Sequence, residues 1–500
     1  MLNALVRFSI RRPWVILVFA VVTFFYGLYS AHIAKLDVFP EFAPAQVVIQ
    51  TEAPGFSAEL VESLVTRPIE AALQGAVGIE SMRSQSIPGL SIVTVVFHEG
   101  SNLYQNRQWV SEKLSTLGQQ LPMGVSSPNM TPLTSSASSV IGFGITSSTR
   151  SLMDLRDLAE FVVRPHILGA EGVADVNVFG GKVRQWQVQF DPQALLRHGV
   201  TVEEVIEATR QASGLRPGGF VEGLNQRVIV TSEGQAEQVN DLALTPLTRR
   251  QGQVLRLKDV AQVVEGAAPS ISAASINATA GVFLMVQGQL GANTYETTLR
   301  VEERLNQLEP MLKREGVQLH RQLFRPANFI ETALQNIQRD IWLGSAMVVA
   351  VLFLFLFNVR TALISAVAIP LSLLASMVVL VHQGVSLNIM VMGGLVIALG
   401  EVVDDAIIDV ENIFRRLREN RQAGFPRADW RVVLSASLEV RHSVIYATFI
   451  VILVFIPMLF MSGVAGRMFE PLALAYIYAL LASRSEEHTS ELQSLAYLVC

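Results

Sequence analysis

Apolar runs are distributed unevenly along this 500-residue chain, and their placement limits the fold more than any other feature. One run, Trp14–Ala31, lies near the N-terminus, and the others crowd together only after Arg339. Between them lies a long stretch with the mixed polar and apolar pattern of water-soluble domains. A helix needs about 20 apolar residues to cross a bilayer. The sequence therefore predicts a chain of which one part lies in lipid and the other in water.

The second group of apolar runs predicts four more complete membrane spans and the beginning of another. The runs are Ile341–Phe357, Thr361–Val381, Leu387–Gly400, Ser443–Met461 and, cut short, Pro471–Ser483. Residues 1–31 and 331–483 are thus expected to form five complete transmembrane helices and a truncated sixth. The first run is longer than the apolar region of about 7–15 residues in a cleavable signal peptide. We therefore interpret it as a retained anchor, with a signal peptide as the alternative.

Composition and charge exclude several classes of protein. Half of the residues are hydrophobic and 16% are charged, which is too apolar for an ordinary soluble protein and too polar for a pure membrane bundle. A net charge of −5, without a basic arm or zinc-type cysteine spacing, indicates no nucleic-acid partner. The single cysteine is the last residue, Cys500, so no disulfide framework is expected. Because no nucleophile elbow, phosphate loop or metal-hydrolase motif is evident, we expect neither an enzyme nor a cofactor.

Basic residues indicate which side of the membrane each segment occupies. Arginines gather in Arg7–Arg12 and in the predicted loop Arg415–His442, which holds seven of them against three acids. The short connections His382–Ser386 and Ser462–Glu470 together contain one arginine. Positive residues accumulate on the cytoplasmic side of membrane proteins. The N-terminus is therefore predicted to be cytoplasmic, and the long segment 32–339 to lie outside the cytoplasm.

The long segment reads as two α/β units with an insertion. Residues 32–134 show the order strand, helix, strand, strand, helix, strand, which suits a ferredoxin-like sandwich. The order restarts at 135–181 and is completed by 265–330, so the second unit is split. The inserted residues 182–264 contain a capping box at Thr201 and Glu204 and a Gly/Pro-rich stretch typical of an extended arm. The predicted class is an α+β membrane protein whose outer part is a binding or docking scaffold.

A row of acids continues directly from one of the apolar runs. On a helix, with 100° per residue, several polar side chains fall on one stripe against an apolar back. Glu401, Asp404, Asp405, Ile408 and Asn412 share this face, and Asp409 and Glu411 lie on its two flanks. A stripe of this kind faces a polar interior rather than lipid.

The ends of this helix indicate how deep the acids lie. Asn388 and Arg415 mark its polar boundaries, which are about 40 Å apart, against a hydrocarbon core of about 30 Å. Asp404 and Asp405 are therefore expected near mid-membrane, with a solvated helix end as the alternative. Each ionised carboxylate there costs at least about 2.5–3.5 kcal/mol, and adjacent acids repel. Both effects favour binding of a proton, so we interpret the acids as a proton relay.

The sequence resembles the resistance-nodulation-division (RND) efflux permeases over essentially Met1–Ser483. The stretch "VVDDAIIDVEN" (Val402–Asn412) looks like the fourth-span relay motif of that family, "RRPWVILV" like its first span and "APGFSAELVESLVTRPIEAALQG" like its first porter helix. "DVFPEFAPAQVVIQTEAPG" and "GLSIVTVVF" look most like the heavy-metal efflux branch. The resemblance implies a proton-driven exporter of metal cations in the bacterial inner membrane.

The resemblance also implies partners and roles. A homotrimer would work with a periplasmic adaptor and an outer-membrane channel, with 182–264 as the docking subdomain whose arm grips a neighbouring protomer. Asp404 and Asp405 match the relay acids, and Glu411 and Asn412 match the family's "EN" pair. Glu401 and Asp409 depart from the commonest metal-branch patterns and are read as extra relay stations. A whole permease would be about twice this length, built as two similar halves.

Metal ligands are not evident in this half. The methionines and histidines of the outer segment show no paired spacing and are interpreted as core or surface residues: Met82, Met123, Met130, Met153, Met285, His32, His98, His166, His198 and His320. Met390 and Met392 could pass a soft cation, although ordinary packing is the favoured interpretation. Two other functions stay open, namely export of drugs or other organic compounds and a membrane-anchored binding or sensory protein without transport.

The last residues do not fit the pattern before them. A predicted span is in progress at Pro471–Ser483 when polarity rises abruptly without a turn or cap signal. Arg484–Ser494 reads as the translation of a common sequencing-library adapter, and we interpret 484–500 as a non-native tail. The alternative is a natural polar C-terminus. On the first interpretation the chain is the front part of a longer protein.

Overall fold

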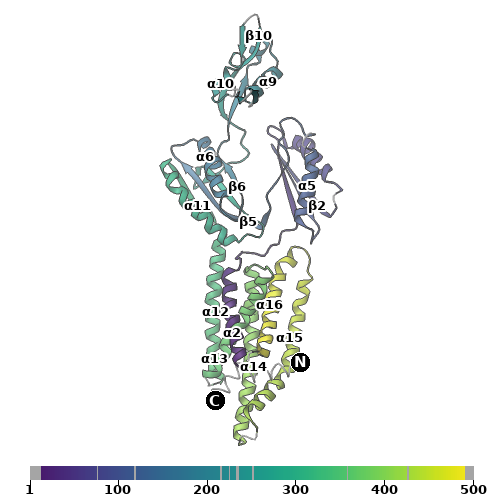
Figure 1. Cartoon of the computed structure of the whole chain (residues 1–500), viewed down its shortest axis with the longest axis vertical. Helices are drawn as coiled ribbons and strands as arrows, with labels where there is room; N and C mark the ends of the chain where they lie inside the picture. Colours follow the sequence, from purple (N-terminus) through teal and green to yellow (C-terminus); the bar gives the residue numbers. More distant parts are fainter. Residues whose placement is uncertain are drawn as a thin grey trace.

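The computed structural model describes residues 13–489, apart from 76, 118–119, 214–216, 224–225, 232–235, 251–252, 357–358 and 425–426. Within some helices and strands only the backbone is described, as for Asp405 and Asp409. The molecule is elongated, with a helix bundle at one end, two α/β units in the middle and a smaller unit at the far end (Figure 1). The predicted mixture of membrane helices and antiparallel α/β units is confirmed.

The first α/β unit has one four-stranded antiparallel sheet with helices on one face. Its elements are β1 (Gln46–Glu52), α3 (Ala58–Val61), η1 (Glu62–Thr66), α4 (Arg67–Leu73), β2 (Ile79–Ile87), β3 (Leu90–Phe97), α5 (Leu103–Leu117) and β4 (Asn129–Met130). The strand order is β2-β3-β1-β4. Alternate residues of β1 and β3 face the helices, and Ile49, Ile69 and Phe97 lie fully buried between the layers.

The second unit repeats this order of elements. It consists of β5 (Thr134–Ser147), α6 (Leu152–Leu158), η2 (Ala159–Val163), α7 (Arg164–Leu168), β6 (Val173–Gly180), β15 (Val282–Gln289), α11 (Thr294–Arg314) and β16 (Val317–Phe324), in the sheet order β16-β5-β15-β6. β5 therefore begins one residue before the predicted boundary at 135. Phe143, Leu284 and Leu305 are buried in its core, so α11 packs firmly on this sheet.

Both units contain a turn of π-helix inside the first helix of the predicted order. In the first unit the helix widens at η1, where the Arg67 N–H donates to the Glu62 carbonyl. Pro68 is the cause, because it has no N–H for the next α-helical hydrogen bond and its ring crowds the preceding turn. η2 lies in the same position before Pro165. The two predicted helices are therefore present, each with one wide turn that the sequence analysis did not anticipate.

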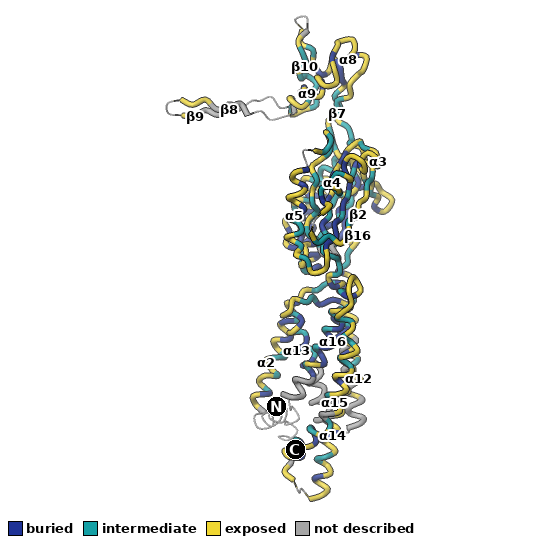
Figure 2. The backbone as a smooth tube through the Cα atoms, turned by 90° about the vertical axis from the view of Figure 1, so that its right-hand side faces the viewer, coloured by how far each residue is buried: buried dark blue, intermediate teal, exposed yellow. Residues whose placement is uncertain are grey.

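The insertion forms a separate unit on a two-stranded stalk. The stalk pairs β7 (Arg184–Phe190) with β12 (Ala261–Ala267), so it extends beyond the predicted end at 264. The unit above it holds α8 (Pro192–His198), α9 (Val202–Ser213), α10 (Val239–Ala243), β10 (Pro246–Arg250), β11 (Gln253–Arg256) and η3 (Leu257–Asp259). The hairpin of β8 (Pro217–Glu222) and β9 (Arg227–Thr231) projects sideways from it as an arm (Figure 2). The capping box is confirmed, since the N–H groups of Thr201 and Glu204 donate to each other's side chains.

An arginine fixes the foot of this stalk to the second unit. Arg184 forms ion pairs with Asp154 and Asp157 of α6 and with Glu265 of β12. The Ser151 hydroxyl and the Arg184 guanidinium hold the pKa of Asp154 below its usual value by stabilising the ionised form. One cation thus joins both strands of the stalk to one helix, which sets the direction in which the stalk leaves the unit.

Among the described residues, six long helices form the bundle: α2 (Pro13–Ile33), α12 (Ala327–Leu356), α13 (Val359–His382), α14 (Ile389–Gln422), α15 (Asp429–Leu459) and α16 (Gly463–Thr489). In the part of the chain that the structure describes, three segments are long and apolar enough to cross a membrane, namely Trp14–Ile33, Trp430–Leu459 and Gly463–Ser483. Pro370–His382 is a shorter apolar helix. The chain is therefore a membrane protein.

Several predicted boundaries in the bundle were wrong. The predicted loop Arg415–His442 is mostly helical, because α14 continues to Gln422 and α15 begins at Asp429. The predicted connection Ser462–Glu470 is helical from Gly463, and Pro471, expected near a helix start, lies inside α16. These segments are amphipathic or polar helix formers, which a search for apolar runs does not detect. α16 continues to Thr489, beyond Ser483, while Arg7–Arg12 and 490–500 lie outside the described residues.

A partly buried ion-pair network joins the second unit to the bundle, and its loss should destabilise the protein. The Arg325 side chain is 6% exposed; it donates to both carboxylate oxygens of Glu302 on α11 at 2.8 and 3.2 Å and to Glu331 on α12 at 3.0 Å. We expect Arg325→Ala to lower the unfolding free energy by about 2 kcal/mol, since it leaves the half-buried Glu302 carboxylate without its charged partner. The thermal unfolding midpoint in detergent measures this.

The matched control is Arg210→Ala on α9. Its ion pair with Glu207 joins side chains that are 64% and 53% exposed, so its loss should cost less than about 1 kcal/mol. Equal midpoints for the two variants would contradict a structural role for the network around Arg325.

Candidate functional site

Helix α14 carries the candidate acids, and its first residue is well defined. Asn388 precedes the helix, and its side-chain oxygen accepts hydrogen bonds from the N–H groups of Met390 and Val391, both at 3.0 Å. This satisfies two of the four free N–H groups at a helix start. The helix ends at Gln422 and is followed by Gly424 in the left-handed conformation, with φ of 80°. Its 34 residues are about 51 Å long.

The apolar side of α14 packs inside the bundle. Ala398, Val402 and Val403 are buried in one cluster with Ala475 and Ala479 of α16. Small residues at this contact allow the two helix backbones to approach closely, as is common between membrane helices. The contact with α16 therefore fixes the rotation of α14 and thereby the direction of its acids.

The acids lie on the other side of the helix. Asp404 and Glu411 are exposed, Glu401 is half-buried, and Ile408 between them is 38% exposed. Asp405 and Asp409 are part of the same continuous helix, although their side chains lie outside what the structure describes. Asp404 follows Asn388 by sixteen residues, or about 24 Å along the helix. As a whole, α14 packs against α15 and α16, which both contain candidate membrane spans.

Asn412 differs from the acids with which the sequence grouped it. It is buried, and its amide nitrogen donates to the Ala436 carbonyl of α15 at 2.8 Å. Arg415 donates to the side-chain oxygen of Asn412 at 2.7 Å. Asn412 therefore holds α14 against α15 in this structure. The one signal in the sequence is that it is the amide within a row of acids, which favours a fixed donor over a titrating group.

A second contact fixes the same pair of helices further along. Arg416 of α14 donates from Nε and Nη2 to the carboxylate of Glu439 on α15. Its Nη1 donates to Glu419 of its own helix. Asn420 donates to the Arg427 carbonyl at 2.9 Å across the short connection. The ends of α14 and α15 beyond the apolar region are thus a braced hairpin rather than a free loop.

Metal ligands do not converge in the described part of the chain. It contains no group of three or more His, Cys, Asp or Glu placed to hold an ion. Met392 is buried in the bundle core and Met390 is half-buried. Met82 and Met130 pack against the core of the first unit, and Met123 is exposed. These positions agree with packing or surface roles.

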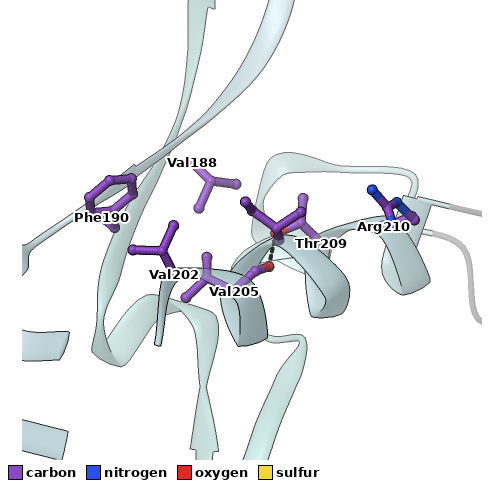
Figure 3. A pocket seen from close by; sticks show the side chains of 7 residues that line it. Val188, Phe190, Val202, Val205, Thr209 and Arg210 are labelled. Atoms are coloured by element: carbon purple, nitrogen blue, oxygen red, sulfur yellow. Dashed lines mark hydrogen bonds between the residues drawn. The ribbon is translucent and has the colours of Figure 1, made fainter. Parts of the chain in front are cut away.

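One hollow in the inserted unit has no chemistry of its own. Its volume is about 370 Å³, and apolar side chains of β7 and α9 line most of it, with Thr209 and Arg210 at one end (Figure 3). The Thr209 hydroxyl donates to the Val205 carbonyl at 2.8 Å, and Arg210 pairs with Glu207. The polar groups around the hollow are thus engaged within α9 itself.

Sequence similarity links the chain to one protein family and to named proteins. A model of the AcrB/AcrD/AcrF family matches residues 5–485. Protein HelA of Legionella pneumophila is 31% identical over 494 residues, which cover 97% of this chain and 46% of that protein. The cobalt-zinc-cadmium resistance protein CzcA of Cupriavidus metallidurans is 29% identical over 496 residues, covering 97% of this chain and 46% of CzcA.

A crystal structure of a heavy metal efflux pump has the same fold. It superposes with a TM-score of 0.84 at 26% identity and covers 99% of this chain and 48% of that one. The helix bundle and the outer α/β units define a class of membrane protein whose fold this chain shares with that pump. The chain belongs to the AcrB/AcrD/AcrF family and, within it, to the heavy-metal efflux branch. It spans about half the length of the curated relatives it matches.

Proposed function

We propose that this chain is the N-terminal half of a proton-driven inner-membrane permease that exports heavy-metal cations. The observation that carries the proposal is the orientation of α14. Its apolar side is packed against α16, while Asp404 and Glu411 are exposed on a face that no described helix of this chain covers. A second helix bundle, supplied by the other half of the permease, would cover that face and bring positive charges to the acids.

The proposed arrangement places six helices in the membrane. α2, α12, α13, α14 and α15 are complete spans and α16 is the sixth, interrupted one, with the N-terminus in the cytoplasm and 32–330 in the periplasm. The two α/β units are ferredoxin-like porter subdomains, which their strand orders support. Residues 182–264 are the docking subdomain for a periplasmic adaptor and an outer-membrane channel. The β8–β9 arm projects sideways from the inserted unit (Figure 2), and we propose that it contacts a neighbouring protomer of a homotrimer.

Proton binding by the acids is the proposed source of energy. A carboxylate in hydrocarbon costs at least about 2.5–3.5 kcal/mol, which makes proton exchange at Asp404 and Asp405 the proposed coupling step. Once ionised, the pair of acids is drawn toward positive charges of the second bundle. Each cycle thus displaces α14 against its neighbours. Glu401, Asp409 and Glu411 extend the row of acids toward both ends, and Asn412 keeps α14 registered with α15.

A metal cation is the proposed substrate because of the relatives, one of which is named a cobalt-zinc-cadmium resistance protein. Met390 and Met392, near the first turn of α14, are the proposed soft groups on the cation's route. The ligands that hold the ion are expected in the half that this chain lacks. No resident cofactor takes part in this mechanism.

Transport by the complete permease in lipid vesicles tests the function. With an imposed pH gradient, Zn²⁺, Co²⁺ or Cd²⁺ should accumulate on the side from which protons leave, and a protonophore should abolish the accumulation. Ethidium serves as the organic probe under the same gradient. If ethidium is transported and none of the three metals is, the permease is an exporter of organic compounds. Metal transport that continues in the presence of the protonophore would contradict proton coupling.

A further inference from the structure

A four-residue segment, Lys35–Val38, links the start of α14 to the outer part of the protein. We call it the strap. It runs beside the connection between α13 and α14, and its backbone is hydrogen-bonded to it. The N–H of Leu387 donates to the Lys35 carbonyl at 2.8 Å, that of Asp37 to the Leu387 carbonyl at 3.2 Å, and that of Ile389 to the Val38 carbonyl at 3.3 Å. Two of these bonds therefore tie the strap to Leu387 in the connection, and the third ties it to Ile389, the first residue of α14.

The other side of the strap holds the start of α11. The Asp37 carboxylate accepts hydrogen bonds from the Thr294 hydroxyl at 2.8 Å and from the Thr294 N–H at 3.3 Å. Lys35 donates from Nζ to the Gly291 carbonyl at 2.5 Å. A carboxylate at a helix N-terminus is favourable because it meets free N–H groups and the positive end of the helix dipole. Asn293 already caps α11 from within, so Asp37 adds a second acceptor from a distant part of the chain.

The strap lies at a junction that is mostly buried, with Asp37 half-buried and Lys35 exposed. Leu387 and Asn388 on one side and Thr294 on the other are each no more than 5% exposed, and Val38 of the strap is 7% exposed. Hydrogen bonds in such surroundings are held more rigidly than at a surface, because water does not compete for their partners. A displacement of α14 along its axis therefore reaches α11 through bonded atoms.

Helix α11 is placed to pass that displacement on. Its buried side chains Val301, Leu305 and Leu312 belong to the core of the second α/β unit. Further along, Glu302 is tied through Arg325 to α12, so α11 is held to the bundle at two separate points. The strap acts at the first residue of α11, and the Arg325 network acts about two turns later.

We propose that the strap transmits movement of α14 to the second α/β unit, with Asp37 as the positioning residue that makes the connection. The inference rests on the proposed function, since it takes the acids of α14 as the origin of the movement. The hydrogen bonds between the strap and residues Leu387 and Ile389 join backbone atoms, so substitution of a side chain does not remove them. The connection to α11 depends on the carboxylate of Asp37 and on the ammonium of Lys35, and it is the part that a substitution can cut.

The test uses the complete permease in vesicles, with Zn²⁺ as the transported probe and a fixed pH gradient. Asp37→Ala should lower the maximal rate by about ten-fold, within the 5- to 150-fold typical of coupling between sites, while the KM for Zn²⁺ stays unchanged. Asp37→Asn keeps an acceptor for Thr294 and should lie between Asp37→Ala and the parent. The control is Glu296→Ala, which removes an acid from the same first turn of α11 but touches only that helix. It should transport at the parent rate.

A disulfide distinguishes transmission from mere stability. In a permease without other cysteines, the double variant Asp37→Cys, Thr294→Cys should transport Zn²⁺ slowly while its two thiols are reduced. Formation of the disulfide between them should restore the transport rate. A restored transport rate supports the proposal that the strap transmits movement of α14 to α11. An Asp37→Ala variant with the parent rate, or an oxidised pair that is thermally stable yet slow, overturns it. Either of these two outcomes contradicts the strap but not the proposed function, provided that export is lost when Asp404 and Asp405 are replaced. Export that continues without those two acids would contradict the proposed function itself.

Discussion

Replacing Asp404 and Asp405 together with asparagine is expected to abolish proton-driven metal export by the complete permease. Asparagine has nearly the same shape as aspartate but cannot bind or release a proton, so α14 keeps its packing and loses its change of charge. The initial rate of Zn²⁺ uptake under a fixed pH gradient should fall by at least about 100-fold, the scale on which positioned proton donors and acceptors act. Protein content of the vesicles and the thermal midpoint should stay at the parent values.

The control for this variant lies on the same helix. Glu419→Gln also removes a carboxylate from α14, but one that is exposed beyond the apolar region and paired with Arg416. It should transport at nearly the parent rate. If the double asparagine variant exported Zn²⁺ normally, the acids would have no part in coupling, and the exposed face of α14 would need another explanation.

Local patterns in the sequence predicted the outer units well. The first strand expected in residues 32–134 is β1 (Gln46–Glu52), because the alternation of side chains between two faces is a property of the strand itself. The capping box at Thr201 and Glu204 is likewise formed within four residues. The π-turns were missed, although Pro68 and Pro165 were visible signals that a hydrogen bond would be lost inside each helix.

The candidate site depends more on contacts between distant residues. Helical periodicity separated Asp404 from Val402 and Val403 by face, as their burial now shows. Periodicity gave no reason to set Asn412 apart, because its partner, the Ala436 carbonyl, belongs to another helix. The strap could not have been predicted at all, since Asp37 and Thr294 are 257 residues apart. Contacts of that kind follow from the packing of whole units rather than from any local pattern.

A valine in place of Gly394 is expected to cause the largest loss of stability in the bundle. Gly394 lies in the first part of α14 where that helix crosses α16. A Cβ atom there would overlap the carbonyl oxygen of Leu472 and lie 3.1 Å from the Cβ of Ala475. Because the first of these atoms belongs to backbone, the helices must separate, which costs about 3 kcal/mol, at the upper end of overpacking. The thermal midpoint of the protein in detergent should fall accordingly.

The adjacent glycine supplies the control. A Cβ atom at Gly393 meets no atom of another part of the described chain within 4 Å, so Gly393→Val makes the same chemical change on the same turn without a collision. It should leave the midpoint close to that of the parent. Since contact with α16 sets the rotation of α14, Gly394→Val should also misdirect Asp404 and slow Zn²⁺ export in whatever protein remains folded. Equal effects of the two valines would mean that α14 and α16 do not pack through Gly394.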